Sequence, residues 1–203
     1  MKIKSLLLIA LLIYVFNVYT TDAQKTPTRT LSFQQWIDEM VNCKDSVYVL
    51  DGADIVFDET KDKEFLKRID NDQAEEIIIH AHIDIRNCNF KTVMHTGVSI
   101  LYDFIILNHF TFRRDVWFYK KNKALGIQFK NCTFDAELSL QGNDFSYLYI
   151  DDTYLKGSFD EVNNKFTNIW FDNVVFEANH DRKFCFFVLA STHLETVNIF
   201  DSR

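Results

Sequence analysis

Three side chains that can ligate a metal occur at every second position in the segment His80-Ala81-His82-Ile83-Asp84. Alternate residues of a β-strand project from the same face, so His80, His82 and Asp84 would lie together. Two imidazoles and one carboxylate are ligands that Zn²⁺ accepts. Arg86 comes next on that face and would repel a cation. These three residues are the metal candidates of the chain, but we favour a solvated strand face and expect no metal.

One basic stretch surrounds the aromatic run Val116-Trp117-Phe118-Tyr119. It interrupts the apolar rhythm of this part of the chain, which predicts a loop or hairpin that protrudes from the fold. An exposed Trp117 or Tyr119 could stack on a sugar while neighbouring cations grip an acidic glycan. The simpler alternative, which we favour, is a solvated insertion whose rings pack onto the core. The candidate ligand contacts are Arg113, Arg114, Trp117, Tyr119, Lys120 and Lys121.

Two pairs of adjacent acids, Asp151-Asp152 and Asp160-Glu161, could serve catalysis. Polysaccharide lyases and hydrolases use such carboxylates, often with calcium or an activated base. Solvated corners of a repeated fold explain these acids more simply. Neither a glycine-rich phosphate loop nor a G-x-S-x-G nucleophile elbow is present. We therefore predict no catalytic residue and no cofactor.

Four cysteines are spread widely, and no C-x-x-C pair occurs among Cys43, Cys88, Cys132 and Cys185. That spacing does not support a zinc or dithiol redox motif. Export of the chain would permit disulfides. Buried free thiols are the simpler expectation, and the sequence leaves the pairing open.

The first residues have the three parts of a secretory signal peptide. Lys2 and Lys4 precede an apolar run from Leu6 to Val18, and Thr21-Asp22-Ala23 offers small residues for cleavage. The run is shorter than the roughly 20 residues that a membrane-spanning helix needs. We expect cleavage after residue 23, a linker over 24–30, and a secreted, periplasmic or cell-envelope protein without a transmembrane span.

Composition narrows the partners. The chain carries a net charge of −7 at pH 7, which disfavours nucleic acid because its phosphates require clustered Lys and Arg. It has 20 Phe and a single Pro, so it can fill a core and sustain long strand pairing. We expect a protein or glycan partner.

Helical signals are confined to the N-terminal part, residues 31–76. Ser32 and Gln35 form a potential capping box for an amphipathic helix ending near Asn42. Strands are expected around the turn Asp51-Gly52, followed by a short charged helix over 59–69. We interpret this region as a cap on a β-rich body over 77–203.

Apolar residues in that body recur every five positions, which neither a helix nor a simple alternating strand requires. Such a period suits a chain that turns a corner after each short extended piece, with four pieces in a coil of about 20 residues stacked on its neighbours. The runs are Ile85 and Phe90; Ile100, Ile105 and Phe110; Phe129 and Phe134; Leu140, Phe145, Ile150 and Leu155; Phe166, Phe171 and Phe176; and Leu189, Leu194 and Ile199.

The motifs around these positions resemble the pentapeptide-repeat family. Cys88-Asn89-Phe90, Cys132-Thr133-Phe134 and Asn143-Asp144-Phe145-Ser146 match its small, polar and central apolar positions. Leu138, Leu148, Ile127 and Ile169 are larger than its small inward residue, and the phase slips after Phe134 and after Leu155. The resemblance implies a right-handed parallel β-helix or solenoid; a β-sandwich or jelly roll is the alternative.

The resemblance also implies a largely noncatalytic function. We expect an exported binding or structural scaffold protein, with a small carbohydrate-active lyase or hydrolase on acidic glycans as the alternative. Leu189, Leu194 and Ile199 keep the repeat in phase close to the last residue. An uncapped coil exposes a strand edge, so we expect an end-to-end homodimer, as the resemblance also implies.

Overall fold

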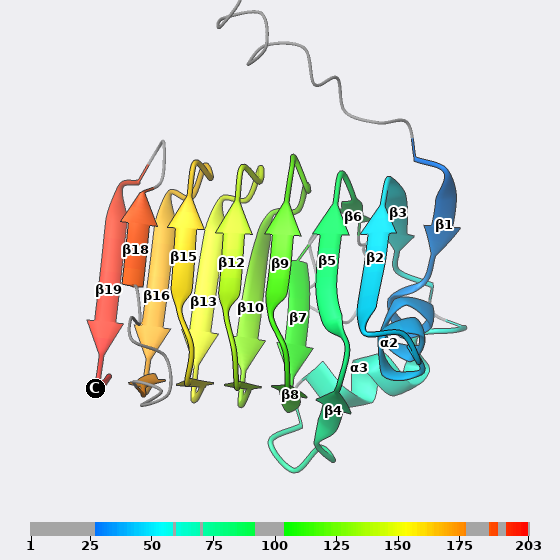
Figure 1. Cartoon of the computed structure of the whole chain (residues 1–203), viewed down its shortest axis with the longest axis horizontal. Helices are drawn as coiled ribbons and strands as arrows, with labels where there is room; N and C mark the ends of the chain where they lie inside the picture. Colours follow the sequence, from blue (N-terminus) through cyan, green and yellow to red (C-terminus); the bar gives the residue numbers. More distant parts are fainter. Residues whose placement is uncertain are drawn as a thin grey trace, which may run out of the picture.

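The computed structural model describes residues 27–58, 60–69, 71–91, 104–177, 187–190 and 194–202. The expected signal peptide, Ile100 and Cys185 lie outside these ranges. The described chain is mainly β, and its strand pairs are parallel (Figure 1). β-Sandwiches and jelly rolls are antiparallel, so the described pairing does not support that alternative.

The strands form three long sheets and one short sheet. Sheet I contains β2 (Val47–Asp51), β5 (His82–Arg86), β9 (Val116–Tyr119), β12 (Leu138–Gln141), β15 (Phe159–Val162) and β18 (Phe187–Ala190). Sheet II contains β4 (Ile77–Ile79), β8 (Phe110–Phe112), β11 (Thr133–Phe134), β14 (Tyr154–Leu155) and β17 (Val175–Phe176). Sheet III contains β7 (Phe104–Asn108), β10 (Gly126–Lys130), β13 (Tyr147–Asp151), β16 (Asn168–Asp172) and β19 (Thr196–Phe200). Sheet IV contains β1 (Arg29–Leu31), β3 (Ala53–Val56) and β6 (Asn89–Lys91).

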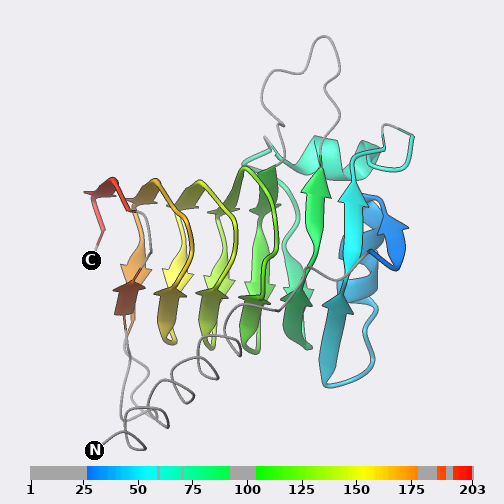
Figure 2. The ribbon, with the colours of Figure 1, turned by 90° about the horizontal axis from the view of Figure 1, so that it is seen from above.

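The chain visits sheets III, II and I in turn and then returns to sheet III (Figure 2). Gly126 pairs with Tyr147 and Tyr147 pairs with Asn168, so a regular circuit takes 21 residues. Two circuits are longer. Ile83 pairs with Val116, 33 residues later, and Phe159 pairs with Phe187, 28 residues later. Segments 92–103 and 178–186 belong to these two longer circuits.

The 21-residue circuit explains both the five-residue rhythm and its slips. Successive inward positions are Phe129, Phe134, Leu140, Phe145 and Ile150, so one step, from β11 to β12, takes six residues. Side chains at equivalent positions stack into columns. These columns are Leu107, Phe129, Ile150 and Phe171 in sheet III; Ile79, Phe112, Phe134, Leu155 and Phe176 in sheet II; Leu50, Ile85, Phe118, Leu140, Glu161 and Leu189 in sheet I; and Ile55, Phe90, Ala124, Phe145 and Phe166 on the fourth side.

Strands of sheets I and III place two large residues inward, where the pentapeptide pattern has one large and one small. Ile127, Leu138, Leu148 and Ile169, the residues that depart from that pattern, are each fully buried. The interior is correspondingly filled with aromatic and branched side chains. Of the aromatic residues expected in the core, Phe90, Phe134, Phe145 and Phe171 are buried, whereas Phe176 is half-buried.

Two rows of corners adopt left-handed backbone conformation. Asn87 and Asn163 have φ of 52° and 56° after sheet I, and Asn131 and Asn173 have φ of 51° and 50° after sheet III. Asn is among the residues that tolerate this region best. The repeated Asn-Cys-x-Phe motif is thus one corner unit: Asn turns the chain, Cys fills the corner and Phe enters the core.

A ladder of buried asparagines runs inside the corner that follows sheet I. The side-chain Nδ2 of Asn122 donates to Oδ1 of Asn143 at 2.9 Å, and Nδ2 of Asn143 donates to Oδ1 of Asn164 at 3.0 Å. The same amides donate to main-chain carbonyls one circuit earlier, including that of Phe118 at 2.8 Å. Buried polar groups are tolerated because each is hydrogen-bonded.

Glu161 ends this ladder and occupies a position that is apolar in every other described circuit of sheet I. Its carboxylate is fully buried and accepts hydrogen bonds from Nδ2 of Asn164 at 2.8 Å and from the backbone N–H of Ala190 at 3.2 Å. The adjacent Asp160 faces the opposite side of β15 because strand residues alternate. The two acids therefore cannot act together on one substrate.

The N-terminal part combines helices with the first strands of the stack. Helix α2 (Phe33–Val41) begins at Ser32 with the capping box to Gln35 that the sequence predicts, and it buries Phe33, Trp36, Ile37 and Met40. Helix α3 (Lys63–Ile69) follows. Strands β2 and β3 already pair with β5 and β6, so the parallel stack begins before Ile77. Arg29 and Thr30, placed in the expected linker, belong to β1.

Replacing Asn143 by Ala should remove one rung of the ladder. The carbonyl of Phe118 would lose its side-chain donor inside the protein, and Asn122 would lose an acceptor. We expect a loss of about 2–3 kcal/mol in the free energy of unfolding, measured by urea denaturation. Asn168→Ala is the matched control because Asn168 is half-buried on the outward face of β16. Equal urea midpoints for the two variants would contradict the role of the ladder.

Candidate functional site

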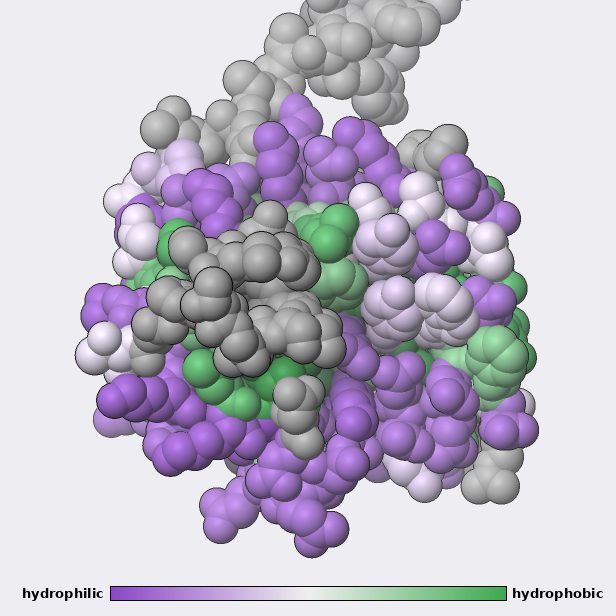
Figure 3. Space-filling view, turned by 180° about the vertical axis from the view of Figure 1, so that it is seen from behind, coloured by the Kyte–Doolittle hydropathy of each residue, from purple (hydrophilic) through white to green (hydrophobic). Residues whose placement is uncertain are grey.

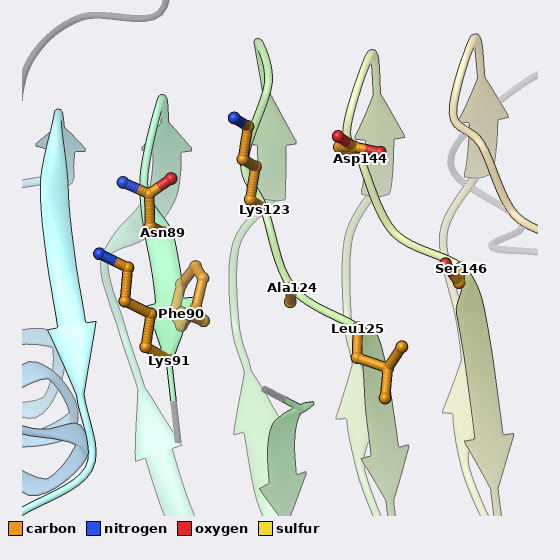
Figure 4. A pocket seen from close by; sticks show the side chains of 8 residues that line it. All are labelled: Asn89, Phe90, Lys91, Lys123, Ala124, Leu125, Asp144 and Ser146. Atoms are coloured by element: carbon orange, nitrogen blue, oxygen red, sulfur yellow. The ribbon is translucent and has the colours of Figure 1, made fainter. Parts of the chain in front are cut away.

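A pocket of about 390 Å³ opens beside sheet IV, where regular strand pairing is replaced by isolated bridges (Figure 4). Its volume lies within the range of small-molecule sites, about 300–1,000 Å³. The lining residues come from three neighbouring circuits: Asn89, Phe90, Lys91, Lys123, Ala124, Leu125, Asp144 and Ser146.

Bridge pairing sets the arrangement of this lining. Asn89 pairs with Lys123, and Lys123 pairs with Asp144, so their side chains form a row across three circuits. Figure 4 shows Asn89, Lys91 and Lys123 extending in the same general direction. The residues between them turn inward, and the inward position between Phe90 and Phe145 is only an alanine, Ala124. Polar side chains therefore surround an apolar floor.

The charges of the pocket are partly neutralised. Asp54, next to the pocket on β3, accepts hydrogen bonds from Nδ2 of Asn89 at 2.7 Å and from Nζ of Lys91 at 2.9 Å. Burial raises the pKa of Asp54, but these two donors outweigh it and hold the pKa below its usual value. On the other side, Nζ of Lys165 lies 3.2 Å from Oδ1 of Asp144.

Lys123 differs from these residues because its ammonium has no ion-pair partner within the described part of the chain. It is exposed at the middle of the bridged row. The pocket thus presents one available cation, an acid whose second oxygen remains for other contacts, and a hydroxyl from Ser146. This combination suits recognition rather than bond cleavage.

The three metal candidates do not assemble into one site. Arg86 binds both carboxylate oxygens of Asp84, including a contact of 2.7 Å from its Nε to Oδ1. His82 instead lies near Asp115, with 3.9 Å between Nδ1 and Oδ2, and His80 is exposed before β5 begins. Among the described residues, no group of three His, Cys, Asp or Glu side chains could hold a metal.

The basic aromatic stretch is not a protruding loop or hairpin, because Val116–Tyr119 is strand β9, paired with β5 on one side and β12 on the other. Arg113 and Arg114 precede this strand, whereas Lys120 and Lys121 follow it, so the strand separates the two cation pairs. Arg113 is engaged by Asp135, with 2.5 Å between Nη1 and Oδ2. The expected single cationic grip is therefore not formed.

Trp117 and Tyr119 lie together on the outward face of sheet I. Their ring centroids are 5.2 Å apart in a stacked arrangement, and the His82 ring meets Trp117 edge-on at 4.2 Å. Both aromatic rings are half-buried. Neither an open sugar platform nor a fully buried pair results.

A second aromatic row, which sequence reasoning missed, lies on the outward face of sheet III. Tyr149 and Trp170 stack at 5.1 Å with an interplanar angle of 9°, and Phe104 and Tyr147 stack at 6.1 Å. Gly126 separates the latter pair, since a Cβ there would lie 2.5 Å from the Phe104 ring. The ring faces contact one another, so this row stabilises the sheet more directly than it offers a flat surface to a sugar.

Asp151 lies at the end of this face. Burial raises its pKa; a hydrogen bond from Gln128 opposes the rise, and the nearby carboxylates of Asp172 and Asp152 add to it. Asp172 is the partner of Asp151 in the strand register. A protonated acid beside an ionised one is the arrangement that general acid–base chemistry uses.

Most of the pocket was also missed at the sequence level. Lys123 was part of the basic stretch, but nothing singled out Lys91 or Asp144. The signal lies in the outward neighbours of Phe90, Ala124 and Phe145. Finding it requires alignment of circuits of unequal length, which a five-residue period does not provide.

Comparison with known proteins gives no family for this chain: no family model, curated protein or solved structure matches it. Across the described residues, no helix is long and apolar enough to cross a membrane. The case for function therefore depends on the geometry of the chain itself.

Burial should make two of the cysteines inert in the native protein. It raises the pKa of Cys88 to about 11 and that of Cys132 to about 12, and the thiolate is the reactive form. We expect iodoacetamide at pH 8 to label the half-buried Cys43 first, and all three only after unfolding. Peptide mass spectrometry can follow each site. Native labelling of Cys88 at the rate of Cys43 would contradict this assignment.

Proposed function

We propose that the chain is an exported, noncatalytic binding or structural scaffold protein built on a right-handed parallel β-helix of pentapeptide-like type. The observation that carries the proposal is the lateral pocket on a stack of in-register parallel circuits. Stacked repeats create a rigid surface, and insertions in single repeats commonly collect at the binding face. The pocket lies directly beside Lys91, where the 33-residue circuit departs from the regular 21.

The partner is a protein or glycan at the cell envelope or outside the cell. Hydrophilic residues form most of the described surface visible in Figure 3, as a protein that works in an aqueous space requires. The net charge of −7 disfavours nucleic acid. Export rests on the N-terminal sequence pattern and places the molecule among envelope polymers.

A small carbohydrate-active enzyme is the second candidate. It is favoured by the raised pKa of Asp151 beside Asp172 on the adjacent strand. A carboxyl pair of this kind can protonate a leaving group and activate water. This pair lies on sheet III and does not line the pocket, so substrate binding and chemistry would be separate.

The two candidates are distinguished by turnover. Purified protein is incubated with acidic and neutral glycans, with and without calcium, and reducing and unsaturated ends are measured. We expect none above the level of the Asp151→Asn variant, together with capture of an envelope component in a pull-down. Ends released by the native chain and lost in Asp151→Asn would establish the enzyme instead.

We also propose an end-to-end homodimer through β19, the outermost described strand of sheet III. Its inward residues Val197 and Ile199 are 38% and 59% exposed, unlike their equivalents Ile169 and Phe171, which are buried. A two-fold-related copy would cover this apolar row with an identical one.

Replacing Ile199 by Glu should dissociate that dimer, because the substitution places a charge in the apolar contact. Sedimentation at micromolar concentration measures the change, with Thr196→Glu on the outward face of β19 as the control. A native chain that sediments as a monomer would refute the dimer.

A further inference from the structure

We propose that the lateral pocket binds a carboxylate-bearing sugar unit, of the uronic acid type, within an acidic glycan. The proposal rests on the binding function above and names the ligand class of the same site. It concerns the pocket lined by Asn89, Lys91, Lys123, Asp144 and Ser146, with Phe90, Ala124 and Leu125 as its apolar part.

The available cation selects the negative charge. Lys91 is engaged by Asp54, and Lys165 by Asp144, so these pairs contribute little net charge. Lys123 lies between them in the bridged row and has no ion-pair partner among the described residues. A ligand carboxylate beside its ammonium gains a charge-assisted hydrogen bond, which is stronger than a neutral one.

The remaining polar groups suit hydroxyls. A sugar hydroxyl both donates and accepts, so its site must offer acceptors as well as donors. Asp144 directs one oxygen to Lys165 and can accept with the other, and the Ser146 hydroxyl can do either. An acidic side chain of a peptide would offer only acceptors and would be repelled by Asp144.

The floor of the pocket suits the apolar C–H face of a pyranose. Leu125 is 37% exposed, and Ala124 leaves space between Phe90 and Phe145. Sites for small ligands combine such apolar surface with a few placed polar groups. A bare phosphate would not use this floor, and a single lysine would be a sparse set of donors for its several oxygens.

The test uses the full purified chain and a tetragalacturonate probe in calorimetry. Its matched probe is the same oligosaccharide with the carboxylates reduced to neutral alcohols. We expect measurable binding of the acidic probe, at least tenfold weaker binding of the reduced probe, and a similar loss in Lys123→Glu. Lys44→Glu, an equal charge change on the exposed loop before β2, should leave binding unchanged.

Several outcomes would overturn the proposal. These are no binding of the acidic probe, equal binding of both probes, or unchanged binding by Lys123→Glu. Oligoglutamate that binds as well as tetragalacturonate, with the same loss in Lys123→Glu, would identify an acidic peptide site instead. Retained urea midpoints for both variants show that neither result reflects unfolding.

Failure here and failure of the proposed function give different results. A chain that captures an envelope component but ignores tetragalacturonate remains a binding protein with another ligand. A chain that cleaves glycans, with cleavage lost in Asp151→Asn, is an enzyme even where the Lys123 site holds.

Discussion

The structure depends on one constraint: each circuit must return the chain to the same height in the interior so that parallel strands remain in register. The 21-residue return meets it by placing Phe129 beside Ile150 and Ile150 beside Phe171. A shift by one residue would turn every inward side chain outward. Five-residue steps with one six-residue step satisfy this requirement, and longer circuits are accommodated only where the added residues lie outside the paired strands.

The corners make that return possible. Asn and Asp residues adopt left-handed backbone at successive turns, and the buried amides of Asn122, Asn143 and Asn164 satisfy carbonyls that the turns remove from regular pairing. Glu161 shows how far the same logic extends, because a carboxylate replaces an apolar residue where hydrogen-bond donors are at hand. The polar ladder thus allows sharp corners around an otherwise apolar interior.

The pocket follows from a local departure from this regularity. Beside Lys91 the short sheet IV gives way to single bridges, and Ala124 stands in a column of larger residues. The same rigid stack then holds side chains from three circuits in one row. A binding site on such a frame needs little reorganisation when a ligand arrives, which favours specificity over conformational change.

The sequence by itself determined the mainly β character, the capped helix at Phe33 and the burial of Cys88 and Cys132, because these depend on local patterns of polarity and turn residues. Only the tertiary structure decided which circuits pair. The 33-residue return places Asn89 beside Lys123, and no local period contains that distance. Strand pairing likewise separated Arg113 from Lys120 at opposite ends of β9 and directed Asp160 and Glu161 to opposite faces. Long-range register sets these neighbours, since hydrogen bonds between circuits join residues that composition and spacing leave far apart.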